Sequence, residues 1–269
     1  MRKEIGREIE MLLPMVASVG LFVLGAVSNA QPRQEHECTQ DSLEGDYGYV
    51  FTGAFVGIGP VAAVGLASFD GAGSVTASDT ISDNGIIGRR IGAGTYTVNV
   101  NCTGSAEIGD DFGKLAFDFM IVPGSRGAEF SFIVTSDGTV QTGVARKTGP
   151  DECTEASLEG TYRVLGAGTN FDVGLISAVG FRVLDGAGHL TSAEDTFSSN
   201  GLISHRVGRA AIYSVNPDCT VSEVFEDGLT FDGVIVAGGR EAYFVRTNSA
   251  PRTVITALYK RKSRHHEDD

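Results

Sequence analysis

The sequence predicts an all-β protein made of two tandem eight-stranded antiparallel up-and-down β-barrels, with one disulfide in each barrel. Three observations predict this fold class. The chain repeats itself once, its β-branched and aromatic runs alternate with glycine, aspartate and asparagine turns, and its four cysteines divide evenly between the repeats. Successive hairpins without crossover helices form a meander, and closure into a barrel removes the exposed edges of such a sheet.

The composition of the chain excludes several classes of protein. Glycine accounts for 36 of the 269 residues, tryptophan is absent, and the formal net charge is −13. Apolar residues make up 42% and charged residues 20%, whereas a disordered polymer is poor in apolar residues and rich in charge. The net negative charge argues against nucleic acid as a partner, because the phosphates would be repelled.

Residues 1–30 have the pattern of a signal peptide. Arg2, Lys3 and Arg7 precede an apolar run over 11–27, and small residues at Ser28 and Ala30 fit the requirement of a signal peptidase. We therefore expect cleavage after Ala30, a secreted or periplasmic location, and no membrane span in the mature chain. The alternative is an uncleaved membrane anchor, although the run is short for a bilayer.

An internal repeat defines the expected domains. The segment 38–47, Cys-Thr-Gln-Asp-Ser-Leu-Glu-Gly-Asp-Tyr, returns at 153–162 as Cys-Thr-Glu-Ala-Ser-Leu-Glu-Gly-Thr-Tyr, and the Asp-Gly-Ala-Gly of 70–73 returns at 185–188. The expected parts of the chain are a signal peptide at 1–30, a first barrel at 38–147, a linker at 148–152, a second barrel at 153–262 and a polar tail at 263–269.

The four cysteines are expected to form one disulfide in each repeat. Four cysteines allow three pairings, but only Cys38–Cys102 with Cys153–Cys219 respects the duplication. A metal site is the alternative, but the chain lacks paired Cys-x-x-Cys spacing and nearby histidines. We expect no metal and no cofactor.

Eight strands are expected in the first repeat, connected by tight turns. Asp70-Gly71, Asn84-Gly85 and Asp137-Gly138 are hairpin signals, because both residues of such pairs accept a positive φ. The expected strands, in order, cover 46–56, 61–69, 74–81, 86–99, 103–108, 114–122, 129–135 and 139–146.

The expected strand at 114–122 is apolar on both faces. Leu115, Phe117, Phe119 and Ile121 alternate with Ala116, Asp118, Met120 and Val122. A barrel strand that faces water would alternate more cleanly. One face therefore fills the barrel, and we expect the other to pack against the sister barrel or another subunit; scattered exposed apolar side chains are the alternative.

Polar residues present in both repeats are the candidate ligand-binding residues. An arginine and a carboxylate inside a small barrel could bind a ligand or transfer protons. The candidates are Tyr47, Arg90, Tyr96, Asp118 and Glu129 in the first repeat and Tyr162, Arg206, Tyr213, Asp232 and Glu241 in the second. Asp79 and Asp195 form a further shared pair. The alternative is that these residues are solvated strand faces or structural ion pairs.

Several catalytic patterns are excluded, and the catalytic residues stay unknown. The Gly-Ile-Gly-Pro of 57–60 leads into a strand rather than the helix that a dinucleotide fingerprint requires. No Gly-x-Ser-x-Gly elbow is present, and the body of the first repeat contains no histidine. The segment 79–85 lacks the alternating oxygen ligands of an EF-hand loop.

The motifs Ser-Leu-Glu-Gly-x-Tyr, Asp-Gly-Ala-Gly and Tyr-x-Val-Asn-x-x-Cys-Thr resemble those of an uncharacterised group of exported bacterial tandem-repeat proteins. That group is similar to the eight-stranded barrels of the allene oxide cyclase and dirigent type, within the broader calycin-like shape. The resemblance covers both repeats and implies a fold. No cyclase motif matches, so it transfers no catalytic residue.

The expected function is non-enzymatic: either a small apolar ligand held in a barrel, or a protein partner, including self-association, on the outer barrel faces. An isomerase or cyclase of the allene oxide cyclase type, using Arg90 or Arg206 with a carboxylate, is the alternative, and a structural envelope or matrix protein is the third. Residues 38–147 carry 6 basic and 12 acidic side chains, whereas 153–262 carry 10 and 12. The extra arginines of the second repeat are where we expect a difference in role.

Overall fold

The structure is a computed structural model that describes residues 37–111, 113–125, 127–149, 152–248 and 252–262. The expected signal peptide at 1–30 with its cleavage site at Ala30, and the polar tail at 263–269, lie outside the described residues. The expected linker at 148–152 lies partly outside them. Within the described residues, no helix is long and apolar enough to span a membrane.

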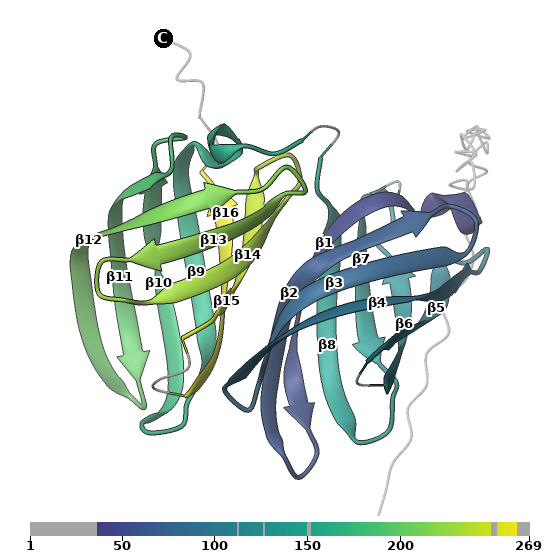
Figure 1. The fold of residues 1–269 in the computed structure, drawn as a ribbon, viewed down its shortest axis with the longest axis horizontal. Helices are drawn as coiled ribbons and strands as arrows, with labels where there is room; N and C mark the ends of the chain where they lie inside the picture. The colour runs from purple at the N-terminus through teal and green to yellow at the C-terminus, as the bar shows by residue number, and fades with distance from the viewer. Residues whose placement is uncertain (1–36, 112, 126, 150–151, 249–251, 263–269) are drawn as a thin grey trace, which may run out of the picture. The chain divides into compact units, whose positions relative to one another are not determined.

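The predicted fold class is confirmed: the chain forms two closed antiparallel barrels of eight strands each, which lie in one compact unit (Figure 1). The strands of the first barrel are β1 (Glu44–Phe55), β2 (Gly59–Asp70), β3 (Ser74–Asp83), β4 (Ile86–Val98), β5 (Thr103–Asp110), β6 (Gly113–Ile121), β7 (Glu129–Val134) and β8 (Thr139–Lys147). The strands of the second are β9 (Gly160–Asn170), β10 (Gly174–Leu184), β11 (His189–Ser199), β12 (Leu202–Val215), β13 (Thr220–Phe225), β14 (Thr230–Val236), β15 (Glu241–Arg246) and β16 (Thr253–Arg261).

The turns explain why the strands end where they do. Asn84 and Gly85 both have positive φ, at 47° and 79°, as the tight turn between β3 and β4 requires. The Asp70-Gly71 prediction was wrong in detail. Only Gly71 of that pair has a positive φ, and the carboxylate of Asp70 instead accepts the backbone N–H groups of Ala72, Gly73 and Ser74 in a three-residue loop.

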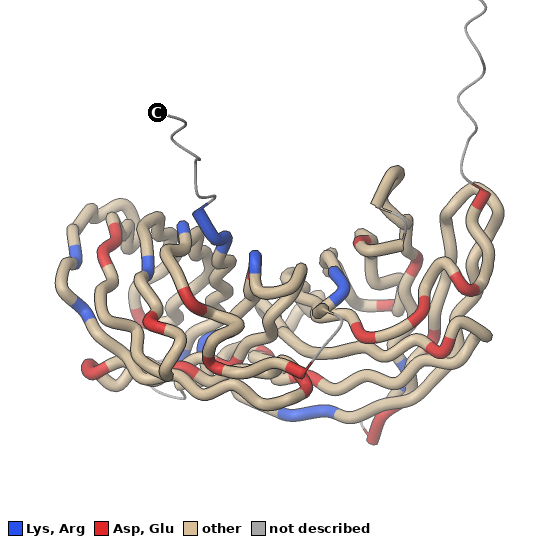
Figure 2. Tube along the Cα trace, turned by 90° about the horizontal axis from the view of Figure 1, so that it is seen from above, with Lys and Arg blue, Asp and Glu red and all other residues tan. Residues whose placement is uncertain are grey.

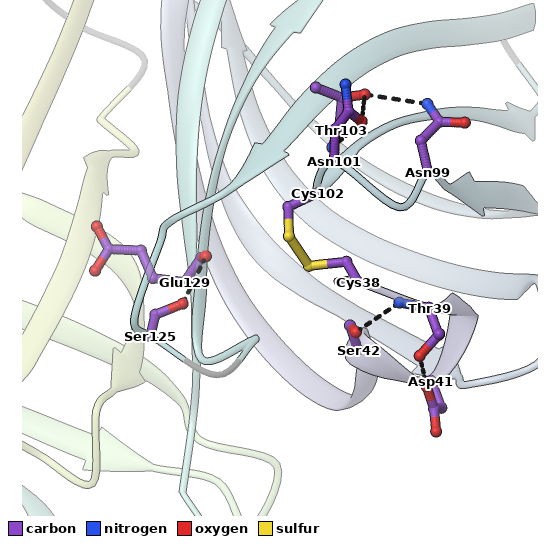
Figure 3. Close-up of a disulfide and its surroundings, with 10 residues drawn as sticks. All are labelled: Cys38, Thr39, Asp41, Ser42, Asn99, Asn101, Cys102, Thr103, Ser125 and Glu129. Atoms are coloured by element: carbon purple, nitrogen blue, oxygen red, sulfur yellow. Dashed lines mark hydrogen bonds between the residues drawn. A yellow bond between two sulfur atoms is a disulfide. The ribbon is translucent and has the colours of Figure 1, made fainter. Parts of the chain in front are cut away.

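A short 3₁₀ turn and a disulfide close one end of each barrel. The turns are η1 (Gln40–Ser42) and η2 (Glu155–Leu158). Leu43, directly after η1, and Leu158, the last residue of η2, are both fully buried. The predicted pairing is confirmed, because Cys38 bonds Cys102 (Figure 3) and Cys153 bonds Cys219. The 3₁₀ turn and its buried leucine thus form a plug at one end of each barrel. The hairpins β1–β2, β3–β4, β5–β6 and β7–β8, with their counterparts, lie at the opposite end, which we call the open end because the described residues form no 3₁₀ turn there.

The two barrels pack through outer strand faces. Strands β14, β15 and β16 of the second barrel contact β1, β2 and β3 of the first (Figure 1). The contact buries an apolar cluster of Val50, Ala62, Val64, Val234, Val236, Tyr243, Val245 and Val254. Packing of an outer face against the sister barrel was expected from the strand at 114–122, and the observed contact uses other strands. The outer face of β6 makes no such contact, and its Met120 is 55% exposed.

Candidate functional site

An arginine and an aspartate face each other inside both barrels. Arg90 and Asp79 are direct cross-strand partners, and Arg90 donates from Nε and Nη2 to the two carboxylate oxygens at 2.9 and 2.5 Å. In the second barrel Arg206 and Asp195 are cross-strand partners in the same way, with Nε 2.6 Å from Oδ1. The structure therefore brings the predicted Arg90 and Arg206 together with a carboxylate.

In the first barrel this pair lies in a small, filled site. The Tyr49 hydroxyl donates to Asp79 Oδ2 at 2.9 Å, and burial, together with the Asp79 charge, raises the pKa of Tyr49 well above its usual value. Asp110 lies 4.0 Å from Arg90 Nε. The cavity beside these residues has a volume of about 40 Å³, which is about the volume of one water molecule.

The second barrel differs from the first at interior positions that alanine occupies in the first copy. Arg182, Glu223 and Tyr259 take the places of Ala67, Ala106 and Ala145. The equivalences follow from strand register: Arg182 pairs with Tyr162 as Ala67 pairs with Tyr47, Glu223 pairs with Tyr213 as Ala106 pairs with Tyr96, and Tyr259 pairs with Val164 as Ala145 pairs with Tyr49.

These three side chains form a buried polar cluster. Tyr259 donates from its hydroxyl to Glu223 Oε2 at 2.9 Å. Within the described residues, the other carboxyl oxygen of Glu223 and the Nε of Arg182 have no hydrogen-bond partner. Burial raises the pKa of Glu223 from 4.5 to about 7, although the Tyr259 hydrogen bond and the charges of Arg182 and Arg209 act in the opposite direction.

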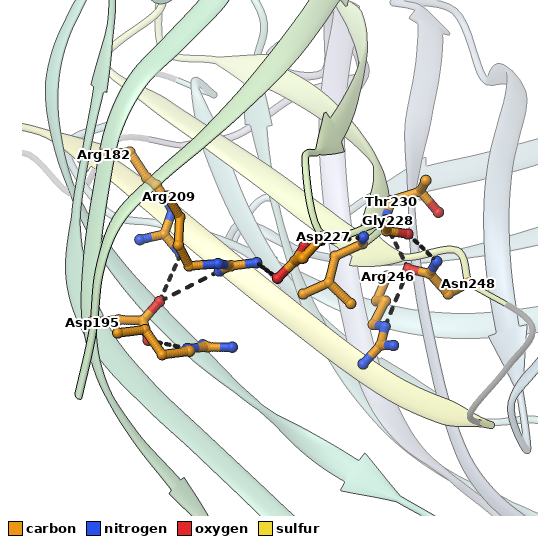
Figure 4. A network of polar contacts seen from close by, with 10 residues as sticks. Arg182, Asp195, Arg209, Asp227, Gly228, Thr230, Arg246 and Asn248 are labelled. Carbon is orange, nitrogen blue, oxygen red and sulfur yellow. Dashed lines mark hydrogen bonds and ion pairs between the residues drawn. The ribbon is translucent and has the colours of Figure 1, made fainter. Parts of the chain in front are cut away.

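Further arginines connect this cluster to the open end of the barrel (Figure 4). Arg182 Nη2 lies 3.2 Å from Asp195 Oδ2, and Arg209 reaches from Asp195, at 3.9 Å, to Asp227, at 2.6 Å. Arg209 enters the barrel where β12 carries one extra residue, beside Gly208 with φ +64°. The register places Gly92 at this position in the first barrel.

Arg246 is the side chain of this region that is buried without a carboxylate partner. The residue is only 7% exposed, and its Nε makes a long contact of 3.4 Å to Asn248 Oδ1. Among the residues that the structure describes, no carboxylate oxygen lies within ion-pair distance of its guanidinium. Burial lowers the pKa of Arg246, and the charge of Arg206 lowers it further, while Asp227 acts in the opposite direction. The first barrel has Val134 here, since Phe117 pairs with Val134 as Phe231 pairs with Arg246.

The two barrel interiors therefore carry charges of opposite balance. In the first, Arg90 faces the two carboxylates of Asp79 and Asp110. In the second, the arginine network, as we name it, consists of Arg182, Arg206, Arg209 and Arg246 with Asp195, Asp227 and Glu223. The four arginines outnumber the three carboxylates, and because burial raises the pKa of Glu223 to about 7, the positive excess is larger whenever Glu223 is protonated. Basic residues are spread through the second barrel in Figure 2, whereas the first is mainly acidic.

The tyrosines predicted as ligand-binding residues lie at the plugged end. Their hydroxyls donate to backbone carbonyls: Tyr47 to Gly127, Tyr96 to Leu43, Tyr162 to Gly239 and Tyr213 to Glu155. Burial raises the pKa of all four hydroxyls. These bonds tie the plug and the turns around it to the barrel wall, which is a structural role.

The predicted carboxylates Asp118, Asp232, Glu129 and Glu241 point outwards and are not part of the arginine network. Asp232 accepts from Thr80 Oγ1 at 2.9 Å and from Arg89 Nη2 at 2.7 Å, both on the first barrel. Glu241 pairs with Arg146, also on the first barrel, at 2.8 Å. These two carboxylates therefore belong to the contact between the barrels.

Sequence reasoning missed Arg182, Arg209, Glu223, Arg246 and Tyr259 because it looked for residues shared by both repeats. The informative signal was a difference between the repeats rather than a residue that both repeats share. At the repeat offsets of 115 and 117 residues, Arg182 and Glu223 stand where the first copy has alanine. A charged residue in one copy opposite an inward-facing alanine in the other marks a change inside the barrel.

Comparison with known proteins adds little to this site. No known protein family matches the sequence, and a search of curated proteins finds no match. A structure comparison finds similarity to a protein of unknown function from the DUF3598 family of Nostoc punctiforme, with 9% identity and a TM-score of 0.26, covering 84% of this chain and 100% of the other. That similarity supports no argument about the site. The two closed eight-stranded barrels of this chain agree with the barrel architecture that the resemblance implies, without a demonstrated link to allene oxide cyclases or dirigent proteins.

Proposed function

We propose that the second barrel binds a small organic anion, a carboxylate with an apolar body, at its open end, and that the arginine network is the anion site. The observation that carries the proposal is Arg246. A buried guanidinium without a carboxylate partner destabilises a folded chain, and a bound anion would remove that cost. Guanidinium groups suit this task because their planar N–H donors match a carboxylate.

Aromatic rings beside the arginines support an apolar body for the ligand. The guanidinium of Arg206 stacks on Phe197, with Cζ 4.2 Å from the ring centre, and Arg209 stacks on Phe225 at 4.4 Å. Stacking leaves the guanidinium edges available while an apolar surface lies next to them. The apolar ligand expected from the sequence is therefore narrowed to an apolar ligand that also carries a negative charge.

The compartment follows from the disulfides. One disulfide in each barrel indicates an oxidising environment, either extracellular or periplasmic. We further propose that residues 1–30 direct the chain there as a cleaved signal peptide, which sequencing of the mature N-terminus would test.

Ligand binding is tested by thermal stability and calorimetry with hexanoate at constant ionic strength, with chloride as the reference salt. A ligand at 100 times its Kd stabilises a protein by about 2.7 kcal/mol, so we expect the melting temperature of the unmodified protein to rise with hexanoate. Arg246→Val, which installs the residue of the first barrel, should abolish that rise.

The matched control is Arg240→Val, which removes the same charge from an exposed position at the plugged end, where Arg240 Nε donates to Ala237 O at 3.0 Å. This variant should keep the full response. Inorganic phosphate in place of hexanoate separates an anion site in general from a carboxylate site. An equal response of the Arg246→Val variant, or no response of the unmodified protein, would refute the proposal.

A further inference from the structure

The contact between the barrels joins two different faces. Face A of the first barrel comprises the outer residues Val50, Ala62, Val64 and Val144. Face B of the second barrel comprises the outer residues Val234, Tyr243, Val245 and Val254. Because the chain is a duplication, each barrel has both faces, and the contact within the chain uses only one face of each.

Face A of the second barrel is exposed and apolar. Val179 on β10, Leu165 on β9 and Leu258 on β16 are cross-strand neighbours and form a row. In the first barrel Val64 on β2, Val50 on β1 and Val144 on β8 form the equivalent row. The row in the first barrel packs against the sister barrel, whereas the three side chains in the second are 38% to 61% exposed.

Face B of the first barrel is exposed and apolar as well. Met120 stands at the position of Val234, Ile133 at that of Val245 and Val140 at that of Val254, and these three are 51% to 67% exposed. Met120 and Ile133 line a surface depression of about 740 Å³ together with Asp118 and Ser131. A contiguous apolar patch left exposed on a folded domain is typical of an interaction site.

The polar groups of the two free faces also match. Within the chain, Asp232 on face B accepts from Thr80 and Arg89, which are cross-strand partners beside face A. The first barrel has Asp118 at the position of Asp232. The second barrel has Thr196 and His205, again cross-strand partners, at the positions of Thr80 and Arg89.

A second pair of charges repeats the same relation. Arg146 beside face A bonds Glu241 beside face B at 2.8 Å. The equivalent residues on the free faces are Lys260 and Glu129, because Lys260 pairs with Glu241 as Arg146 pairs with Glu129. Lys260 is largely exposed. A cation on free face A would therefore again meet a carboxylate on free face B.

The free faces differ from the faces in contact by the size of two side chains. A Cβ at Gly48, beside face A of the first barrel, would clash with Val234 and Val236, and the second barrel has Arg163 at that position. On free face B, Ser131 stands where face B of the second barrel has Tyr243. In a contact between molecules Arg163 would face Met120 and Val122, which stand at the positions of Val234 and Val236, so the two strands must lie further apart there than in the contact within the chain.

We propose that face A of the second barrel docks on face B of the first barrel of another copy of this chain, which repeats the intrachain contact between molecules. Such a contact is heterologous, so each added copy presents a new free face A. The copies therefore assemble head to tail into a ring or an open filament rather than a symmetric dimer.

The test uses two double variants of the full chain. Leu165→Glu with Val179→Glu blocks face A, and Met120→Glu with Ile133→Glu blocks face B; all four side chains are exposed, so folding is not expected to change. In sedimentation velocity, the unmodified protein should assemble beyond a dimer as its concentration rises, and each variant alone should stay monomeric.

An equimolar mixture of the two variants distinguishes this geometry from any other. The free face A of one variant can still bind the free face B of the other, so the mixture should form a dimer and stop there. The matched control, Ile212→Glu with Val224→Glu on exposed cross-strand neighbours of β12 and β13, should assemble like the unmodified protein. A monomeric unmodified protein, a self-associating blocked variant, a monomeric mixture or a dissociated control would each overturn the proposal.

Discussion

Replacing Glu223 by glutamine should change the stability of the protein in a way that depends on pH. The carboxyl group is fully buried, and its pKa in the folded chain is about 7 against 4.5 for an exposed glutamate. Glutamine has the same shape, stays neutral at every pH, and can still accept the hydrogen bond from Tyr259. The substitution therefore isolates the effect of ionising this one group.

The sign follows from proton binding. Between pH 4.5 and 7 the unfolded chain has lost this proton while the folded chain still holds it, so the free energy of unfolding falls as pH rises through that window. Below pH 4.5 both states are protonated and above pH 7 both are ionised, so the contribution is constant there. One pH unit within that window corresponds to about 1.4 kcal/mol. Between pH 5 and pH 8 the free energy of unfolding of the unmodified protein should therefore fall by about 2 to 3 kcal/mol relative to that of Glu223→Gln.

Urea unfolding at pH 5, 6, 7 and 8 measures this difference. Circular dichroism is the suitable signal, because the chain contains no tryptophan. The control is Glu226→Gln, which neutralises an exposed carboxylate on the neighbouring hairpin and should give a difference that does not vary with pH in this range. A difference between the unmodified protein and Glu223→Gln that stays constant from pH 5 to pH 8 would show that Glu223 is not desolvated.

Three further predictions concern the barrels as folded units. Ala106→Glu places a carboxylate in the first barrel at the position of Glu223, where Ala67 offers no counter-charge, and should cost more than about 3 kcal/mol in urea unfolding; Ser105→Glu on the outer face is its control, and equal losses would contradict the inward orientation. Tyr47→Phe leaves the carbonyl of Gly127 without its buried donor and should cost about 1 to 3 kcal/mol, whereas a neutral effect would show that water replaces the bond. Replacing Cys38 and Cys102 by serine removes a bond that restricts the unfolded chain across a sequence separation of 64 residues, and should lower the free energy of unfolding by about 4 kcal/mol. A loss below ~1 kcal/mol would show that the plug stays in place without the disulfide.

The strands of the first barrel could be predicted because local chemistry determines their ends. The expected range 74–81 became Ser74–Asp83, and 129–135 became Glu129–Val134, since a turn residue with a positive φ or a side-chain acceptor lies close to each boundary. The disulfides could be predicted because duplication leaves one consistent pairing. These features depend on neighbours in sequence or on the repeat, both of which the sequence displays directly.

The arginine network could not be predicted in the same way because it depends on which side chains meet across the barrel. Arg206 with Asp195 was accessible, since both repeats carry the pair. Arg246 gives no local signal: it ends a short apolar strand, and only the closed barrel shows that it is buried without a carboxylate partner. The charge state of Glu223 likewise depends on burial, which the residue type alone does not indicate.

The two barrels carry the same carboxylates on their outer faces but different side chains in their interiors. Asp118 and Glu129 repeat Asp232 and Glu241, yet only the second pair contacts the sister barrel. Inside, alanines of the first copy have become Arg182, Glu223 and Tyr259. Asp118 is exposed, and since an exposed carboxylate contributes little to stability, folding alone does not require it; Glu129 is half-buried and already pairs with Arg146 of its own barrel at 2.6 Å. A contact between molecules that repeats the contact within the chain would require both, whereas an anion site in one barrel requires the interiors to differ.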